Sequence, residues 1–316
     1  MLDPRRAIAW LVVLGALVVL PFATEDEGTI TVAILALIVA SLASSWNILG
    51  GFAGQISLGH AAFFGIGALI TREMWLGGTN VLVAMLVGVL VTAVLAGVIG
   101  VPILRFRGVY FSIGTLAAAQ ALWITVGNVR SGITSLPAEA LRAYEFTPRY
   151  FLALAVTVLT VAVAMLLKRS KLGLGMIAVR EDEAAAAATG VNVLAHKLSA
   201  FVISAGLAAL AGAVYGSFSS SYYPNFPFSP VWTFDAILVT FVGGFGTIVG
   251  PLIGSFFFVV VRDTLAANLQ EFQVVVFGVL FIIVVLLLPG GMVEGWRRLT
   301  GLTSSRGVTE QGGKTG

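Results

Sequence analysis

Cysteine is absent from this 316-residue chain, and charged residues are scarce. Without cysteine the protein has neither a disulfide framework nor a thiolate metal site. Only 10% of its residues are charged, against about a quarter in soluble proteins, while 58% are hydrophobic and the mean hydropathy is +1.01. This composition excludes a soluble globular protein and predicts an all-α polytopic membrane protein.

The longest stretch without Asp, Glu, Lys or Arg runs for 44 residues, from Gly28 to Thr71. A membrane helix needs about 20 apolar residues to cross about 30 Å of hydrocarbon, so this stretch predicts two passes. Between them stands GGFAGQISLGH, residues 50–60, whose glycines weaken a helix and whose polar side chains lipid cannot satisfy. Irregular polar backbone at membrane depth is tolerated where it is buried in protein or lines a cavity.

A second glycine break, GGFGTIVGP at 243–251, repeats the Gly-Gly-Phe opening of the first. Paired interrupted segments in two halves of a chain indicate a transporter's central pathway. Close helix packing is the alternative for any single glycine, and a lone His60 would more often hydrogen-bond between helices than carry protons. The clustering of polar groups favours the pathway. We therefore predict as pathway residues Gln55, Ser57, His60, Gly51, Gly54, Gly243, Gly244 and Gly246.

Uncharged runs predict about ten membrane spans within a single membrane domain, residues 1–302. The spans are 7–23, 30–49, 54–71, 81–104, 109–127, 150–167, 198–220, 234–249, 251–268 and 271–289. Residues 243–251 could instead be a re-entrant turn or a kink inside one long helix, so eight or nine spans remain open. The Gly-, Ser- and Thr-rich tail, 303–316, is predicted to be disordered.

Basic residues orient these spans. With the N-terminus inside, thirteen of the eighteen Lys and Arg residues fall inside and five outside, Arg72 among the latter, which predicts that both termini face the cytoplasm. The same bias explains the net charge of +3, so we expect no nucleic-acid partner. Asp235, Arg262, Asp263 and Glu271 are predicted near span ends, where they reach water. No convergent set of ionisable groups is expected in the membrane, so we predict neither catalytic residues, nor a bound metal, nor a cofactor, and energy supplied from outside this chain.

The longest inside loop, 168–197, predicts a short helix outside the membrane. Glu181, Asp182 and Glu183 suit the positive end of a helix, the alanines from Ala184 are the best helix formers, and Gly190 is a natural terminator. Composition alone leaves two interpretations open: a docking element for a cytoplasmic partner, or a solvated connector between spans.

Four motifs carry a family resemblance. NILGGFAGQISLGHAAFFGIGA at 47–68 resembles the signature of LivM-type permeases of branched-chain amino acid ABC importers. RFRGVYFSIGTLAAAQ at 105–120, the loop and span at 178–216, and FVGGFGTIVGPLIG at 241–254 are similar to later motifs of the same family, in the family's order.

The resemblance implies a bacterial inner-membrane permease working with a LivH-like second permease subunit, two cytoplasmic ATPases and a periplasmic substrate-binding protein. It implies Leu, Ile and Val as substrates, although related permeases serve urea, amides or other amino acids. A secondary carrier or channel is the alternative outside this family. By the resemblance, the short helix is the ATPase coupling element. Its residues are Glu181, Asp182, Glu183, Ala184, Ala185 and Gly190.

Overall fold

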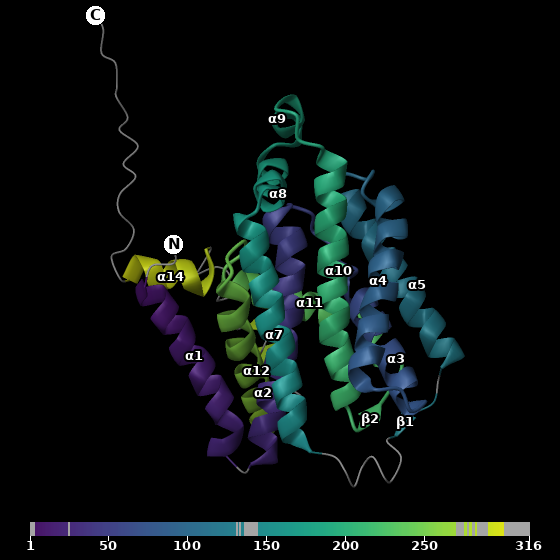
Figure 1. The fold of residues 1–316 in the computed structure, drawn as a ribbon, viewed down its shortest axis with the longest axis vertical. Helices are drawn as coiled ribbons and strands as arrows, with labels where there is room; N and C mark the ends of the chain where they lie inside the picture. Colours follow the sequence, from purple (N-terminus) through teal and green to yellow (C-terminus); the bar gives the residue numbers. More distant parts are fainter. Residues whose placement is uncertain are drawn as a thin grey trace, which may run out of the picture.

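The computed structural model describes residues 4–24, 26–130, 132, 134–135, 145–269, 275–276, 278–279, 282 and 290–299, and it is built almost wholly of helices (Figure 1). The elements are α1 (Pro4–Ala23), α2 (Glu27–Asn47), a π-helix (Ile48–Phe52), α3 (His60–Leu76), α4 (Val81–Ile103), α5 (Val109–Val129), β1 (Thr134–Ser135), α7 (Phe146–Arg169), α8 (Lys171–Glu181), α9 (Glu183–Ala188), α10 (Val193–Phe218), β2 (Ser221–Tyr222), a 3₁₀ turn (Phe226–Phe228), α11 (Val231–Gly243), α12 (Gly250–Leu269) and α14 (Gly291–Leu299). The predicted fold class, an all-α polytopic membrane protein, is confirmed.

Five of the described helices are long and apolar enough to cross a membrane: α2 with its π-helix, α4, α5, α7 and α10. Trp10–Ala23 within α1 and Val231–Gly243 are shorter apolar helices. Most of the predicted span 271–289 and the whole tail 303–316 lie outside the described residues. The total of eight to ten spans therefore stays a prediction.

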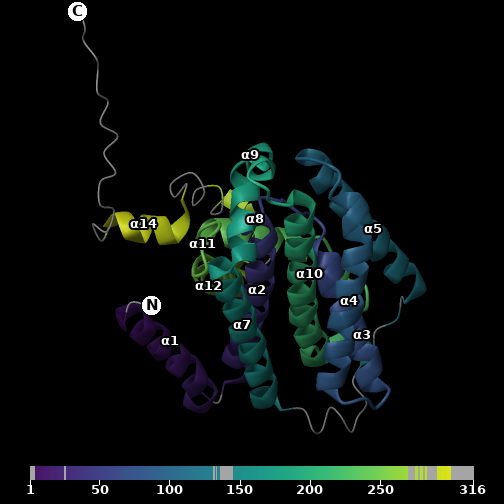
Figure 2. The ribbon, with the colours of Figure 1, turned by 45° about the horizontal axis from the view of Figure 1, so that its top comes forward.

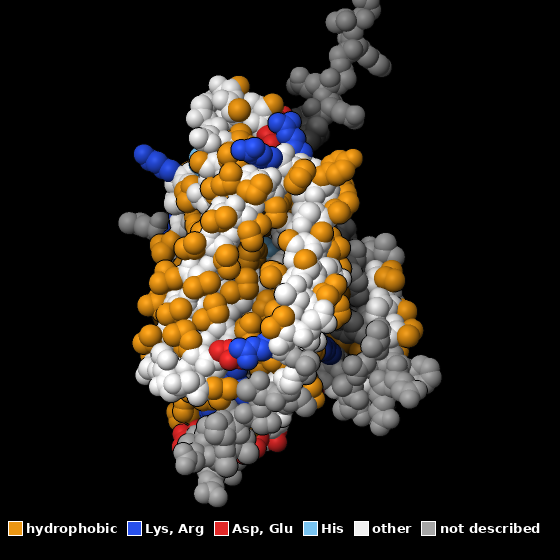
Figure 3. All heavy atoms as spheres, turned by 90° about the vertical axis from the view of Figure 1, so that its right-hand side faces the viewer, with side chains coloured by type: hydrophobic (Ala, Val, Ile, Leu, Met, Phe, Trp, Pro, Cys, Tyr) orange, Lys and Arg blue, Asp and Glu red, His pale blue; other side chains and the backbone are white. Residues whose placement is uncertain are grey.

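The bundle is organised around α2. In the apolar stretch of α2 and its π-helix 89% of the residues are buried inside the protein, whereas in that of α5 only 17% are buried. Figure 3 shows the face at the right of Figure 1, where hydrophobic side chains are spread over most of the height of the bundle and charged side chains are few. Since lipid tails are as apolar as these side chains, an outer face of this kind suits contact with lipid, and α2 is held inside by its neighbours.

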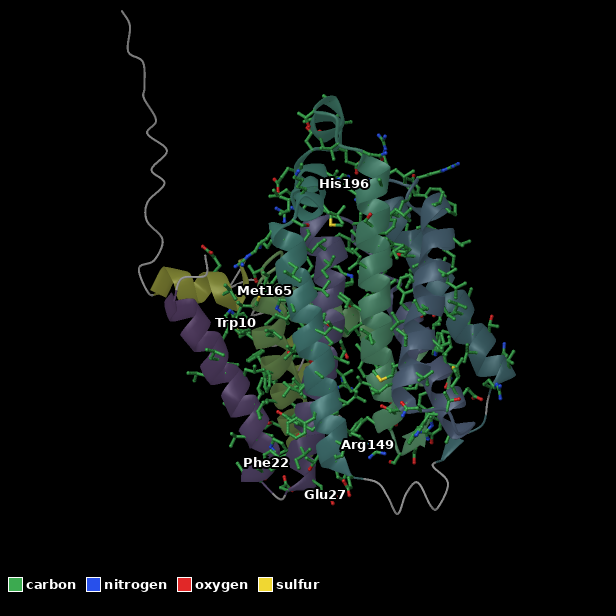
Figure 4. The ribbon with its side chains drawn as sticks, viewed as in Figure 1. Trp10, Phe22, Glu27, Arg149, Met165 and His196 are labelled. Atoms are coloured by element: carbon green, nitrogen blue, oxygen red, sulfur yellow. The ribbon has the colours of Figure 1, made fainter. Side chains whose placement is uncertain are left out.

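The bundle has two distinct ends. α8 and α9 protrude at one end, which we call the α9 end, whereas α14 and the start of α1 lie lower, at the side of the bundle (Figures 1 and 2). At the opposite end, Figure 4 shows Phe22, Glu27 and Arg149, where α1 turns into α2 and α7 begins. β1 and β2 pair antiparallel at this opposite end, with Thr134 opposite Tyr222.

Two predicted spans are shorter or shifted in the structure. The predicted span 54–71 is α3, which begins only at His60 and continues to Leu76. The predicted span 234–249 is α11, which begins at Val231 and ends at Gly243. α12 starts at Gly250 after a non-helical connection, so residues 243–251 do not form a kink within one long helix.

The placement of Arg72 in an outside loop is wrong. This residue belongs to the last turns of α3 and is fully buried. Its guanidinium donates to the carbonyl oxygens of Gly216 (3.3 Å), Ser219 (2.9 Å) and Ser220 (3.4 Å), at and just beyond the end of α10. A cation near these carbonyls satisfies groups that the helix end leaves without partners, which explains why the charge is buried.

Candidate functional site

The first glycine break is a π-helix followed by a non-helical return. Gly54, at φ +69°, turns the chain after Phe52, and the amide of Gln55 donates back to the carbonyl of Leu49 at 3.1 Å. Residues 54–59 are then irregular until α3 begins at His60. The predicted break therefore exists, and it lies inside the bundle, since Phe52, Ser57 and Gly59 are all buried.

Side chains from α2 and α5 hold this irregular backbone. Trp46 Nε1 donates to the Ser57 carbonyl at 2.8 Å, and Ser112 Oγ donates to the Ile56 carbonyl at 2.6 Å. The amide of Leu58 donates to Thr115 Oγ1 at 3.0 Å. These bonds give the irregular backbone the hydrogen-bond partners that lipid cannot provide. Sequence reasoning missed Trp46, Ser112 and Thr115, and a pairing between α5 and the break has no signal in a hydropathy pattern.

The three polar residues predicted for the pathway lie close together but in different settings. Gln55 is 8% exposed, while Ser57 and His60 have no exposed surface. Ser57 Oγ accepts from the Gly59 amide at 3.2 Å. Both ring nitrogens of His60 are buried without a hydrogen-bond partner among the residues that the structure describes. A buried imidazole without partners is costly, so His60 marks a position that the folded chain does not satisfy by itself.

The starts of two helices meet beside His60. The Ala61 amide, in the first turn of α3, donates to Thr233 Oγ1 of α11 at 2.8 Å. The Phe64 and Trp232 rings stack with centroids 4.5 Å apart. α11 has only thirteen residues, so it crosses about 20 Å. Both helices thus begin within the bundle, which is the arrangement that discontinuous helices have in transporters.

The second break lies directly against the first, at the α9 end. Gly244 and Gly246 have φ of +138° and +71°, values that favour glycine. Asn47 joins the two breaks: its side-chain NH₂ donates to the Thr247 carbonyl at 2.7 Å, and its side-chain oxygen accepts from the Gly246 amide at 2.9 Å. A Cβ added to Gly51 would lie 2.9 Å from Gly246 Cα. We call this contact the Asn47 clasp.

Two basic side chains connect the clasp to the segment 168–197, which contains α8 and α9. Arg180 of α8 donates to the Gly51 carbonyl at 2.5 Å, and Lys168 at the end of α7 donates to the Gly246 carbonyl at 2.9 Å. Gly54 also contacts Arg180, because a Cβ there would lie 2.8 Å from Arg180 Cγ. The sequence did not single out Asn47, Lys168 or Arg180.

The predicted short helix after residue 181 is confirmed as α9. The Asp182 carboxylate caps it by accepting from the amides of Ala184 (2.8 Å) and Ala185 (3.0 Å), and Gly190 follows with φ +88°. Glu183 forms an ion pair with Lys197, which is buried at the start of α10. Ala184 and Ala185 are exposed, so the tip of α9 presents small apolar side chains to whatever lies outside the bundle.

A helix that the sequence did not predict, α8, precedes α9. Gly175 and Met176 are buried on its inner face, and a Cβ at Gly175 would lie 2.3 Å from His196 Nε2 of α10. The loop is therefore packed on the bundle through α8, which disfavours a simple solvated connector.

A family model described as the branched-chain amino acid transport system permease component matches residues 28–285. The chain belongs to this family. The matched residues include both glycine breaks, the Asn47 clasp and the α8–α9 loop. It is accordingly a multi-pass membrane permease of this family.

Two curated relatives support the assignment. The high-affinity branched-chain amino acid transport system permease protein LivM of Salmonella typhimurium is 28% identical, over 96% of this chain and 76% of the relative. LivM of Escherichia coli gives the same identity and coverage. No solved structure matches the chain significantly.

Proposed function

We propose that this permease is the membrane-spanning subunit of an ATP-driven importer of Leu, Ile and Val in the bacterial inner membrane. Its partners in this proposal are a LivH-like second permease subunit, two cytoplasmic ATPases and a periplasmic binding protein that delivers the amino acid. The observation that carries the proposal is the family match over residues 28–285, together with relatives named for branched-chain amino acid transport.

In this proposal both termini and the α9 end face the cytoplasm. Lys168, Arg169, Lys171, Arg180 and Lys197 belong to or flank the α8–α9 loop, which protrudes beyond the spans in Figure 1. Such an excess of basic residues in a short loop is typical of the cytoplasmic side.

We propose α9 as the ATPase contact. Ala184 and Ala185 form its exposed tip, while Glu181, Asp182 and Glu183 fix its orientation through a contact with Arg180, a helix cap and an ion pair with Lys197. Gly190 ends the element with a positive φ. Small side chains at the tip suit insertion into a groove of a partner, because they allow close backbone approach.

The glycine breaks are the proposed moving part of the pathway. Gln55, Ser57 and His60 lie before and at the start of α3. Gly54, Gly244 and Gly246 form the turns of the two breaks, while Gly51 and Gly243 belong to the helical segments that lead into them. Alternating access at this place requires the clasp or its neighbours to rearrange when the ATPases close.

Uptake by proteoliposomes tests the assignment. The purified complex with its ATPases and binding protein should accumulate labelled leucine only when ATP is supplied, and omission of either partner should abolish accumulation. Uptake that persists in vesicles without the ATPase would replace the importer with a secondary carrier or channel.

The substrate is decided by a separate measurement on the cognate binding protein. Calorimetry with Leu, Ile, Val, urea and a short aliphatic amide should give binding for the three branched-chain amino acids alone. Binding of urea or of the amide in their place would retain the importer and change its substrate.

A further inference from the structure

Asp235 of α11 and Arg262 of α12 form an ion pair, with Arg262 Nη1 donating to Asp235 Oδ2 at 3.1 Å. The position of this ion pair along the bundle axis follows from the contact between α11 and α2. Thr240 Oγ1 lies 3.2 Å from the Ala43 carbonyl, and the two helices run in the same direction, because Asn47 bonds to the segment just after α11. Asp235, five residues before Thr240, is therefore level with about Ile38 of α2.

Ile38 lies near the middle of the long α2 and π-helix segment, Glu27–Phe52. At about 1.5 Å per residue it is about 16 Å from the end at Glu27 and about 21 Å from the other end. The pair is thus near half depth. The sequence predicts both residues near span ends; Asp235 does lie in the first turns of α11, but α11 begins inside the bundle.

The exposure of the pair is unusual for this depth. The Arg262 side chain is 50% exposed and that of Asp235 is 14% exposed. Charged side chains within the bilayer face the bundle interior or a water-filled cavity, since lipid cannot solvate them. The face of α11 and α12 that bears Arg262 is therefore not a lipid-facing surface.

We propose that Arg262 and Asp235 bind the zwitterionic head group of an α-amino acid on this face during translocation. The guanidinium has five N–H donors, so donors remain for a substrate carboxylate beside the bond to Asp235. The Asp235 carboxylate accepts from the substrate ammonium group. Val231, one turn before Asp235 on the same helix face and 53% exposed, supplies apolar surface for an aliphatic side chain.

This inference rests on the proposed function but has its own test. The purified permease complex, without binding protein, is equilibrated with labelled leucine and challenged with 4-methylpentanoate, which lacks the ammonium group, and with 3-methylbutylamine, which lacks the carboxylate. We expect leucine to bind and the two analogues to compete at least tenfold more weakly.

Arg262→Gln and Asp235→Asn should each weaken leucine binding at least tenfold. The control Arg130→Gln, in a more exposed pair with Glu73, should bind as the unaltered complex does.

Uptake distinguishes binding from a purely structural ion pair. In proteoliposomes, Arg262→Gln should lose leucine uptake at least tenfold while ATP hydrolysis stimulated by the loaded binding protein persists. The double variant Asp235→Leu with Arg262→Leu replaces the pair by apolar contact; if it restores uptake, the pair only holds α11 to α12 and the proposal is overturned. Absence of leucine binding to the unaltered complex also overturns it. If leucine binds as predicted but is never accumulated with ATP, the proposed function fails while this site stands.

Discussion

At the residue scale, Arg72 shows how this bundle accommodates a full charge. Its guanidinium lies at the end of α10, bonded to backbone carbonyls and placed over the rings of Trp75 (5.6 Å) and Tyr222 (5.4 Å). Burial raises the pKa of the Tyr222 hydroxyl above its ordinary value, with a smaller contribution from Tyr215, and the nearby guanidinium opposes the shift. Tyr222 therefore remains neutral and packs as an aromatic ring.

Replacement of Arg72 by alanine should destabilise the fold. The buried Gly216 carbonyl would lose a charged donor, at a cost of about 1–3 kcal/mol for an unsatisfied group, and the more exposed Ser219 and Ser220 carbonyls would lose theirs at a smaller cost. Thermal unfolding in detergent, followed by tryptophan fluorescence, should show a clear fall in midpoint. Arg130→Ala, at a more exposed ion pair, should shift it little. Equal midpoints for the two variants would contradict the structural role of Arg72.

Gln55 provides a residue-scale test of the first break. Gln55→Leu removes a nearly buried amide at a turn where Gly54 already fixes the backbone. If the amide lines the pathway, uptake should fall at least tenfold with the complex still assembled. Thr125→Leu on the exposed side of α5 is the matched control and should leave uptake unchanged. Unchanged uptake in Gln55→Leu, with normal assembly, would remove Gln55 from the pathway.

At the element scale, Arg180 links α8 directly to the first break, because its guanidinium donates to the Gly51 carbonyl. Arg180→Gln should keep the Asp182 cap and the Glu183–Lys197 ion pair of α9, lose the contact with Glu181 and weaken the link to Gly51. We therefore expect leucine uptake per ATP hydrolysed to fall several-fold. Arg169→Gln, an exposed residue at the same end, serves as the control. An unchanged ratio in Arg180→Gln would show that movement reaches the breaks by another route.

Close packing of α3 on α10 gives a second element-scale prediction. A Cβ added at Gly212 of α10 would lie 1.9 Å from the Phe64 carbonyl, whereas one at Gly206 on the same helix would meet only Val89 at 3.7 Å. Gly212→Ala should therefore destabilise the bundle by about 1–3 kcal/mol through overpacking. Gly206→Ala should be neutral or stabilise it, because alanine is the better helix former by about 1 kcal/mol. Unfolding midpoints in the opposite order would show that Gly212 does not serve the packing of α10 on α3.

How far the sequence predicts these elements depends on whether the signal is local. The break at 50–60 and helix α9 were predictable, since glycine content, Asp182 as a cap and Gly190 as a terminator all act within a few residues. The Asn47 clasp joins positions about 200 residues apart, and Arg72 bonds to Ser219 about 147 residues away. A hydropathy pattern indicates that such buried polar groups need hydrogen-bond partners, but it does not identify those partners. For the same reason the depth of Arg262 emerged only from the contact of α11 with α2.

For the whole molecule, the absence of cysteine makes orientation directly measurable. A single Gly190→Cys variant should react with a membrane-impermeant maleimide only from the cytoplasmic side, and Gly78→Cys, in the exposed turn between α3 and α4, only from the periplasmic side. A Cβ at either glycine meets nothing within 4 Å, although both have positive φ, so modest local strain is expected. Labelling with the sides reversed would invert the proposed topology.

The burial of Arg72 also has a consequence for assembly, because its hydrogen-bond partners are synthesised much later than Arg72 itself. α3 leaves the ribosome long before α10, because the Gly216 carbonyl follows Arg72 by 144 residues. During that interval the guanidinium has none of its final α10 carbonyls to bond. We therefore expect Arg72 to keep its hydration near the membrane surface until α10 packs against α2, α3 and α4. The burial of this early charge is thus completed only when α10, a later helix, supplies the carbonyl oxygens that accept from Arg72.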